Sequence, residues 1–195
     1  MKLVAVIVTY NRVAMLADCL AAYERQTHPP DVVLVVDNAS SDGTAELLHD
    51  WARSGDPASS DRVVVRMREN VGGSGGFFAG TRAALGLGAD WIWVADDDAF
   101  PEPDVFQRLV RHLAESKGAG ETAAVCSEVR RHGERELISR QVRRKGLIRL
   151  RFESIPDRAY SSRQFQCNDF SYVGVAMNAI HLAQVGLIDR RLFIW

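Results

Sequence analysis

The chain contains 195 residues, 47% of them hydrophobic and 25% charged, which is typical of a folded soluble domain and excludes a disordered or fibrous chain. This length provides for one sizeable domain with its own core and excludes two comfortable ones. Because 24 Lys and Arg residues face 25 Asp and Glu residues, for a formal net charge of −1, no overall field attracts nucleic acid, and any charge-based function must be local.

Strand and helix patterns alternate along the first half of the chain. Leu3–Thr9 and Val32–Val36 are continuous apolar stretches, typical of strands buried on both faces of a parallel sheet. The segment between them carries apolar side chains at helical spacing, at Val13, Leu16, Leu20 and Tyr23.

The alternation continues to residue 95. Asp42–Trp51 predicts a helix, Val63–Met67 a third strand and Trp91–Ala95 a fourth buried strand. Before the last of these, Thr81–Leu87 lies in a predicted helix that begins near Ser74. The pattern predicts an α/β fold with right-handed crossovers and a mostly parallel sheet, in which ligands bind beyond the carboxyl ends of the strands.

The second half has weaker periodicity. The segment Arg130–Arg163 is rich in Arg and Lys and predicts a β-hairpin or excursion. We interpret its basic character as a solvated face, with contact to an anionic lipid-linked acceptor or a membrane surface as the alternative. Phe170–Met177 then predicts a buried strand, and Ala179–Val185 a short helix closed by Gly186.

Three acids, Asp96, Asp97 and Asp98, follow the fourth strand directly. Neighbouring carboxylates raise each other's pKa unless a cation intervenes, and Mg²⁺ or Mn²⁺ accepts one or two carboxylates together with water and phosphate oxygens. Strand alternation would direct Asp96 and Asp98 the same way and turn Asp97 elsewhere. The alternative is an acidic turn before a helix at Pro103.

Polar residues also follow the first two strands, and we expect them to share one crevice with the acidic triplet. After the second strand, Asp37 is placed to accept the N3–H of a uracil or thymine ring, while Ser40 or Ser41 is expected to cap the next helix, with Asp42 in its first turn. For Ser41 and Asp42 we favour capping over ligand contact. Arg12, after the first strand, is either an anion contact or a surface charge at a helix start.

A glycine-rich run follows the third strand, with four glycines in the five positions from residue 72 to 76. Glycines let a backbone approach a ligand closely and present N–H groups at a helix start, which suits a phosphate or sugar. A flexible loop is the alternative interpretation. The spacing matches neither a dinucleotide-binding fingerprint nor a P-loop.

The cysteines and the termini indicate a cytoplasmic protein. Cys19, Cys126 and Cys167 lack the spacing of a disulfide framework or a zinc site, which fits a reducing compartment. Cys126 and Cys167 are expected to be packed in the core. The first apolar stretch lacks the cleavage site of a signal peptide, and no apolar run approaches the ~20 residues that span a bilayer. Nothing in the chain resembles a covalent catalytic triad.

Four motifs together resemble the family 2 glycosyltransferases of GT-A fold. They are VIVTYNR, VVDNASSDGT, ENVGGSGGF and WVADDDAFPEPD, in this order. The glycine run and the DDD triplet look most like bacterial galactofuranosyltransferases and related rhamnosyltransferases of cell-wall assembly. The resemblance implies an inverting transfer of a sugar from a nucleotide donor, with UDP-galactofuranose favoured over dTDP-rhamnose, to a glycan or polyprenyl-linked acceptor, with Mn²⁺ or Mg²⁺ as cofactor.

The resemblance also assigns residues. It implies that Asp96 contacts the ribose or the metal ion and that Asp98 contacts the ion. It further implies a set of donor contacts that frame the base or line the phosphates and sugar, namely Thr9, Tyr10, Arg12, Asp37, Asn70, Gly72, Gly73, Ser74, Gly75, Gly76, Asp96 and Asp97.

One departure concerns the catalytic base. The family places it in an acidic pair after a segment like GLIDRRLFIW, so Asp189 lies too early and the base is expected beyond Trp195. We therefore expect one GT-A domain over residues 1–195, incomplete at its C-terminus, with a nucleotide-binding half (1–100) and an acceptor-side half (101–195) that carries the basic excursion 130–163. Its expected location is the cytoplasm or the inner face of the membrane.

Two other functions stay open. A non-catalytic nucleotide-sugar-binding module would keep the donor site and lack transfer. A sugar-1-phosphate nucleotidyltransferase would share the nucleotide and metal logic, but such enzymes carry a glycine-rich loop with Arg and Lys directly after the first strand, where this chain has TYNR.

Overall fold

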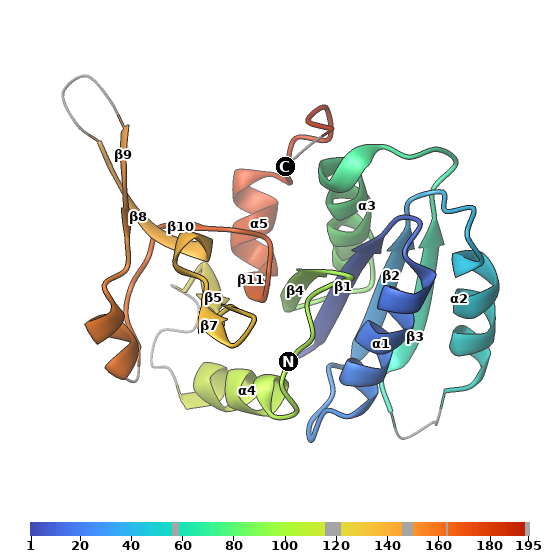
Figure 1. Cartoon of the computed structure of the whole chain (residues 1–195), viewed down its shortest axis with the longest axis horizontal. Coiled ribbons are helices and arrows are strands. Elements are labelled where there is room, and N and C mark those ends of the chain that lie inside the picture. Colours follow the sequence, from blue (N-terminus) through green and yellow to red (C-terminus); the bar gives the residue numbers. More distant parts are fainter. Residues whose placement is uncertain (56–58, 116–121, 146–149, 163, 194–195) are drawn as a thin grey trace.

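A computed structural model describes residues 1–55, 59–115, 122–145, 150–162 and 164–193. Its central sheet has six strands, and the predicted mostly parallel arrangement is confirmed (Figure 1). In spatial order the strands are β3 (Asp61–Arg66), β2 (Val32–Asp37), β1 (Leu3–Thr9), β4 (Trp91–Asp96), β11 (Val175–Asn178) and β5 (Ala124–Cys126). Only β11 runs antiparallel to its neighbours within this sheet.

Helices cover both faces of the sheet because its first strands are apolar on both sides. One cluster of buried side chains packs Leu3, Ala5 and Ile7 of β1 against three helices, α1 (Val13–Glu24), α2 (Thr44–Arg53) and α4 (Val105–Glu115). The alternate residues Val4, Val6 and Val8 face α3 (Gly72–Gly86) and α5 (Ala179–Val185). The helices predicted near residues 13, 42, 81 and 179 are therefore all present.

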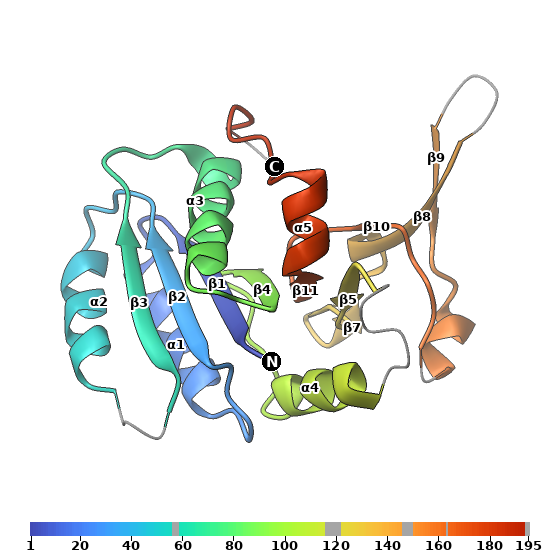
Figure 2. The ribbon, with the colours of Figure 1, turned by 180° about the vertical axis from the view of Figure 1, so that it is seen from behind.

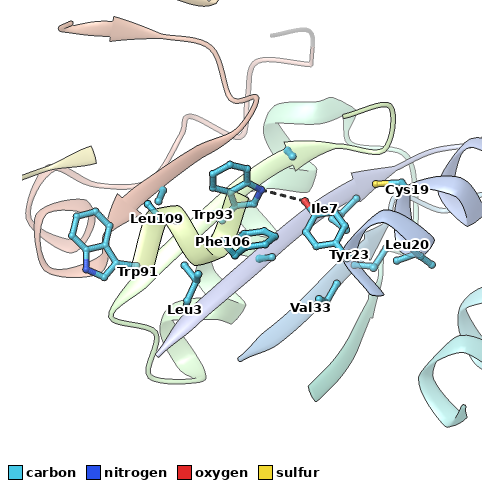
Figure 3. Packing of buried hydrophobic residues seen from close by; sticks show 14 of the residues in the cluster. Leu3, Ile7, Cys19, Leu20, Tyr23, Val33, Trp91, Trp93, Phe106 and Leu109 are labelled. Carbon is cyan, nitrogen blue, oxygen red and sulfur yellow. Dashed lines mark hydrogen bonds between the residues drawn. The ribbon is translucent and has the colours of Figure 1, made fainter. Parts of the chain in front are cut away.

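Aromatic side chains fill the first of these clusters (Figure 3). The Phe106 ring of α4 lies 5.0 Å from that of Trp93 and 5.6 Å from that of Tyr23, measured between ring centroids. The indole N–H of Trp93 donates to the Tyr23 hydroxyl at 3.2 Å. These contacts fix α1 and α4 against β4, just below the strand end that carries the acidic triplet.

An accessory sheet lies at the end of the molecule away from β3, as Figures 1 and 2 show from opposite sides. It contains β10 (Asp169–Phe170), β8 (Arg140–Lys145) and β9 (Leu150–Ser154). Two short strands, β6 (Arg130–Arg131) and β7 (Glu134–Arg135), form a separate hairpin, and 3₁₀ turns occupy Leu137–Ser139 and Asp157–Ser161. The predicted excursion is confirmed, although it contains two hairpins.

One prediction about elements was wrong. The single strand expected over Phe170–Met177 is divided into β10 and β11, in different sheets, because Gly174 adopts a φ of +64° and turns the chain between them. Of the two interpretations of the glycine run, the helix start is confirmed and the loop is not, since α3 already begins at Gly72. No helix of the described segments is long and apolar enough to cross a membrane.

Candidate active site

The acidic triplet lies at the carboxyl end of β4. The strand ends at Asp96, and the backbone N–H of Ala99 donates to the Asp96 carbonyl at 3.2 Å, which closes a turn. Strand alternation therefore does not extend to Asp98, contrary to the reasoning that paired Asp98 with Asp96. The three carboxylates are instead directed by a turn, and their exposure differs: Asp97 is buried, Asp96 is half-buried and Asp98 is exposed.

Asp97 is the most deeply buried acid of the triplet. The residue is 2% exposed, and its carboxylate accepts hydrogen bonds from the Thr9 hydroxyl at 2.7 Å and from Arg12 at 3.0 Å. Arg12 also lies 3.3 Å from the Asp98 carboxylate. Asp97 thus ties the end of β1 to the end of β4, and Arg12 is the cation that faces two of the three acids.

The third acid, Asp96, is electrostatically crowded. Burial, followed by the negative charges of Asp98 and Asp97, raises the pKa of Asp96 to about 7, although Arg12 acts in the opposite direction. A cation beside Asp96 and Asp98 would relieve this repulsion. Within the described residues no three His, Cys, Asp or Glu side chains converge as a complete metal-binding group. A pair of carboxylates fits a Mg²⁺ or Mn²⁺ ion that completes its shell with substrate phosphates and water.

Asp37 lies on the neighbouring strand, opposite Thr9 in the register of β1 and β2. It is 1% exposed. Its Oδ1 accepts the backbone N–H of Ser40 at 2.8 Å, and its Oδ2 lies 3.6 Å from Nε of Arg66. That Oδ2 has no hydrogen-bond donor within the described part of the chain. A buried acceptor without a donor is costly, so Asp37 is suited to accept an N–H group of a ligand.

A hollow of about 270 Å³ opens beside Asp37, between α2 and β3. Its lining is mostly apolar, with Leu48, Ala52 and Val64, and it also includes His49 and Arg66. Sequence analysis did not single out Arg66, although it follows the pattern of polar residues at the carboxyl ends of the strands. The hollow adjoins Asp37 but does not include any acid of the triplet.

Hydrogen bonds from backbone N–H groups to side chains join the loops after β1 and β2. The backbone N–H of Asn11 donates to the Ser40 hydroxyl at 2.9 Å, and the Asn11 side chain accepts the N–H of Ser41 at 2.8 Å. Neither serine caps α2, which corrects the expectation from the sequence: the N-cap position is Gly43, without a side-chain cap. The carboxylate of Asp42, just before it, accepts the hydroxyl of Thr44 at 2.6 Å and its N–H at 3.3 Å, and also the N–H of Val13 at the start of α1.

Asn38, the residue after β2, joins the glycine run to the strand end that carries Asp37. Its side chain donates to Asn70 at 2.9 Å and to the Gly72 carbonyl at 3.0 Å, and it accepts the N–H of Val71 at 3.1 Å. Gly72 has a φ of +70°, which favours glycine. The start of α3 is therefore held next to the end of β2.

The glycines of the run also have a packing role. A Cβ atom on Gly76 would lie 2.5 Å from Val8, and one on Gly80 would lie 2.4 Å from Val6, so α3 requires glycine there to approach β1. All five residues from Gly72 to Gly76 are buried. The hydroxyl of Ser74 has no hydrogen-bond partner within the described chain. Together with Oδ2 of Asp37, it is a buried polar group without a partner near the ends of the strands.

The predicted site residues thus come together along one edge of the sheet. Direct contacts join Thr9, Arg12, Asp97 and Asp98, and the β1–β2 register joins Asp37 to Thr9. Asn38 extends the contacts to the glycine run. Tyr10 is 43% exposed at this edge.

Comparison with known proteins gives a family for this arrangement. The sequence profile described as glycosyl transferase family 2 matches residues 4–175. The chain is 33% identical over 193 residues to galactofuranosyltransferase GlfT1 of Mycolicibacterium smegmatis, an alignment that covers 97% of the chain and 60% of that protein. Its counterpart in Mycobacterium tuberculosis H37Rv is 30% identical over 191 residues, with the same two shares. The chain therefore spans about 60% of the length of these curated relatives.

Solved structures agree in fold. The crystal structure of S. aureus TarS 1-349 superposes with a TM-score of 0.64 at 15% identity, over 95% of this chain and 49% of that one. Mannosyltransferase PcManGT from Pyrobaculum calidifontis, solved in complex with GDP-Man and Mn²⁺, superposes with a TM-score of 0.52 at 26% identity, over 66% of this chain and 36% of that one.

Proposed function

The chain belongs to glycosyl transferase family 2, with the GT-A fold, and we propose that it binds the nucleotide-sugar donor of an inverting glycosyltransferase that uses Mn²⁺ or Mg²⁺. The observation that carries this proposal is the joining of two strand ends, those of β1 and β4, by Thr9, Asp97 and Arg12, with Asp96 and Asp98 beside them. A strand-end crevice of this kind is where α/β sheets bind ligands.

Each part of the donor has a matching group in the proposal. The free acceptor of Asp37 takes an N–H of a pyrimidine base, with Thr9, Tyr10 and Arg66 around it. Asp96 takes the ribose or the ion, and Asp98 takes the ion. A bound divalent cation would stabilise the charge that develops on the departing nucleoside diphosphate. Asn70 and the backbone between Gly72 and Gly76 line the phosphate and sugar.

In this proposal Arg12 also binds the diphosphate of the donor. In the structure it balances Asp97 and Asp98, and its side chain is half-exposed. A half-exposed guanidinium can reorient toward a diphosphate, for which it is a strong hydrogen-bond donor. Asp97 would keep its bond to Thr9 throughout, so the loop after β1 stays attached to β4 while the charge of Arg12 shifts to the donor.

Inversion requires direct displacement with a general base for the acceptor hydroxyl. Asp189 is unsuited to this role, because hydrogen bonds from Arg191 lower the pKa of Asp189 to about 2. We assign the base to a residue that follows the described chain in the whole protein. The proposal therefore gives donor binding to residues 1–195, mainly to 1–100, and the acceptor side to 101–195.

We favour UDP-galactofuranose as the donor, with dTDP-rhamnose as the alternative, since two relatives named galactofuranosyltransferase are 30% or more identical to the chain. The acceptor is proposed to be a glycan or a polyprenyl-linked glycan. A relative named undecaprenyl-phosphate mannosyltransferase, from Micrococcus luteus, is 36% identical over 111 residues, which cover 56% of the chain and 43% of that protein.

An anionic lipid-linked acceptor would suit the β8–β9 hairpin. Residues 140–154 include six Arg or Lys and one Glu, and Arg143, Arg144, Arg151 and Phe152 are exposed on it. We propose peripheral contact with the inner face of the membrane here. Sedimentation with anionic vesicles tests this: binding should weaken strongly from low to high salt and on Arg143→Glu. Salt-insensitive binding, or no binding, would show that the hairpin is a solvated surface without membrane contact.

Calorimetry tests the donor site. Titrations with UDP-galactofuranose, UDP-galactose and dTDP-rhamnose, each with and without Mn²⁺, identify the donor. Asp98→Asn should weaken Mn²⁺-dependent binding by at least about 10- to 100-fold, the cost that loss of a partner of a metal ligand already carries. Asp104→Asn is the matched control, because Asp104 pairs with Arg108 at the start of α4, outside the site. Equal affinity of the Asp98 variant and the parent would refute the assignment, and tight binding without transfer would favour a binding module.

A further inference from the structure

A second cluster of reactive side chains lies away from the acidic triplet, where the central and accessory sheets meet. Cys126 is the last residue of β5, at the edge of the central sheet, and Cys167 precedes β10 of the accessory sheet. Both are partly buried free thiols, and each shifts the pKa of the other. The proposed function uses neither cysteine.

Contacts around Arg140 hold the two thiol-bearing segments together. Arg140 is buried, and its Nε donates at 3.2 Å to the carbonyl of Ser127, the residue after the first cysteine. The next residue of β8, Gln141, accepts at 3.3 Å the backbone N–H of Asn168, the residue after the second cysteine. Adjacent residues of one strand therefore bind the chain next to both cysteines, which brings the two thiol-bearing segments to the same strand.

Arg140 also gives this cluster a positive charge. Its five hydrogen bonds within the described residues all go to carbonyl or hydroxyl oxygens, none to a carboxylate. The hydrogen bond from Cys126, together with the positive charge of Arg140, lowers the pKa of Cys167 to about 7, although burial opposes this. A thiolate is the attacking species in thiol–disulfide exchange.

We infer that Cys126 and Cys167 are a redox modification site, which forms a reversible disulfide by exchange with a small disulfide such as oxidised glutathione. The Cys167 sulfur attacks one glutathione sulfur, the S–S bond breaks, and one reduced glutathione leaves. Cys126 then loses its proton and attacks the Cys167 sulfur, which releases the second glutathione. Two thiols of the protein are oxidised and one glutathione disulfide is reduced to two thiols, so electrons and protons balance.

The new bond would join β5 to the segment that precedes β10, and hence the central sheet to the accessory sheet. This inference does not depend on the proposed function, because the thiols belong to neither donor nor metal site. Cys19 serves as an internal control. It is fully buried, and burial together with the nearby acidic triplet raises its pKa to about 12, so it should not react in the folded chain.

The experiment equilibrates the 195-residue chain with mixtures of reduced and oxidised glutathione, with intact-mass and peptide analysis after acid quenching. We expect one intramolecular disulfide between Cys126 and Cys167, an unmodified Cys19, and an exchange constant at least about tenfold larger for the folded chain than for the chain in urea. The oxidised chain should also unfold about 5 °C higher than the reduced chain. An exchange constant equal in both states would overturn the inference.

Single variants separate the two thiols. Cys126→Ser should trap Cys167 as a stable mixed disulfide with glutathione, whereas the parent chain should lose this adduct as the internal disulfide forms. Cys19→Ala should behave as the parent does. If the parent also retains the mixed disulfide, the thiols do not reach each other and the inference fails. Circular dichroism of each variant establishes that it is folded.

Discussion

The central sheet and the accessory sheet place charged residues in different ways. Along the central sheet, charges lie at the ends of strands that are buried on both faces, and backbone register fixes them, as with Thr9 opposite Asp37. In the accessory half most charges form ion pairs near the surface, such as Arg144 with Glu153 and Arg135 with Asp157. Exposed pairs contribute little to stability. The difference teaches that the chemistry of this chain is built on its apolar strands, whereas the accessory sheet is joined to the central sheet through contacts such as those of Arg140.

The largest effect should come from the core beneath the triplet. Phe106→Ala removes the ring that packs between Trp93 and Tyr23 and should lower the free energy of unfolding by about 3–5 kcal/mol. Phe152→Ala, on the exposed accessory hairpin, should cost about 0.5 kcal/mol or less. Urea unfolding of both variants measures this. Similar losses would show that the accessory half contributes to the core as the central sheet does.

The next-largest effect should come from Arg140, a buried charge of the accessory sheet. Arg140→Met leaves carbonyl oxygens of Ser127 and Val173 without a donor and should cost about 2–3 kcal/mol. The exposed Arg143→Met is the control. Hydrogen exchange should reveal faster exchange over β8 and β10 than over β1 and β2. Unchanged exchange in β8 would mean that strand pairing alone attaches this half.

The same division explains what the sequence predicted. Runs such as Leu3–Thr9 are long and apolar, so periodicity alone predicts buried strands, and the polar residues that end them predict a shared crevice. The basic half has short strands whose pairing depends on distant partners. The division of 170–177 into two sheets depends on the turn at Gly174. The burial of Arg140 among five oxygens could not be predicted either, because the sequence around it is typical of a charged surface.

Within the crevice, the residue types were predictable and their division of labour was not. Whether Asp97 or Asp98 turns inward depends on the turn at residues 96–99, which no periodicity reports. The glycines of the run are required for two different reasons, a close helix–sheet contact at Gly76 and a positive φ at Gly72. Composition alone does not show which reason applies to which glycine. Asn38 binds three groups, which only the fold brings within reach.

The smallest expected effect concerns Arg12. It tests whether the charges at the strand ends of the central sheet are arranged to bind a ligand. Arg12 lies 3.0 Å from Asp97 and 3.3 Å from Asp98, so a cation at Asp98 must compete with its guanidinium. Since a half-exposed pair is worth about 0.2–1 kcal/mol, Arg12→Gln should tighten binding of Mn²⁺ alone by about two- to fivefold. The same change should weaken Mn²⁺-dependent donor binding, because a cation near the diphosphate is lost.

Calorimetry with Mn²⁺ alone and then with the nucleotide donor separates these opposite effects. Arg66→Gln is the matched control, since Arg66 faces Asp37 and no acid of the triplet, and it should leave binding of Mn²⁺ alone unchanged. Asp97 keeps the Thr9 hydrogen bond in the Arg12 variant, so the loop after β1 should stay in place. If Arg12→Gln weakened Mn²⁺ and donor alike, Arg12 would hold the acids in position, and the charges at these strand ends would be arranged for the fold and not for a ligand.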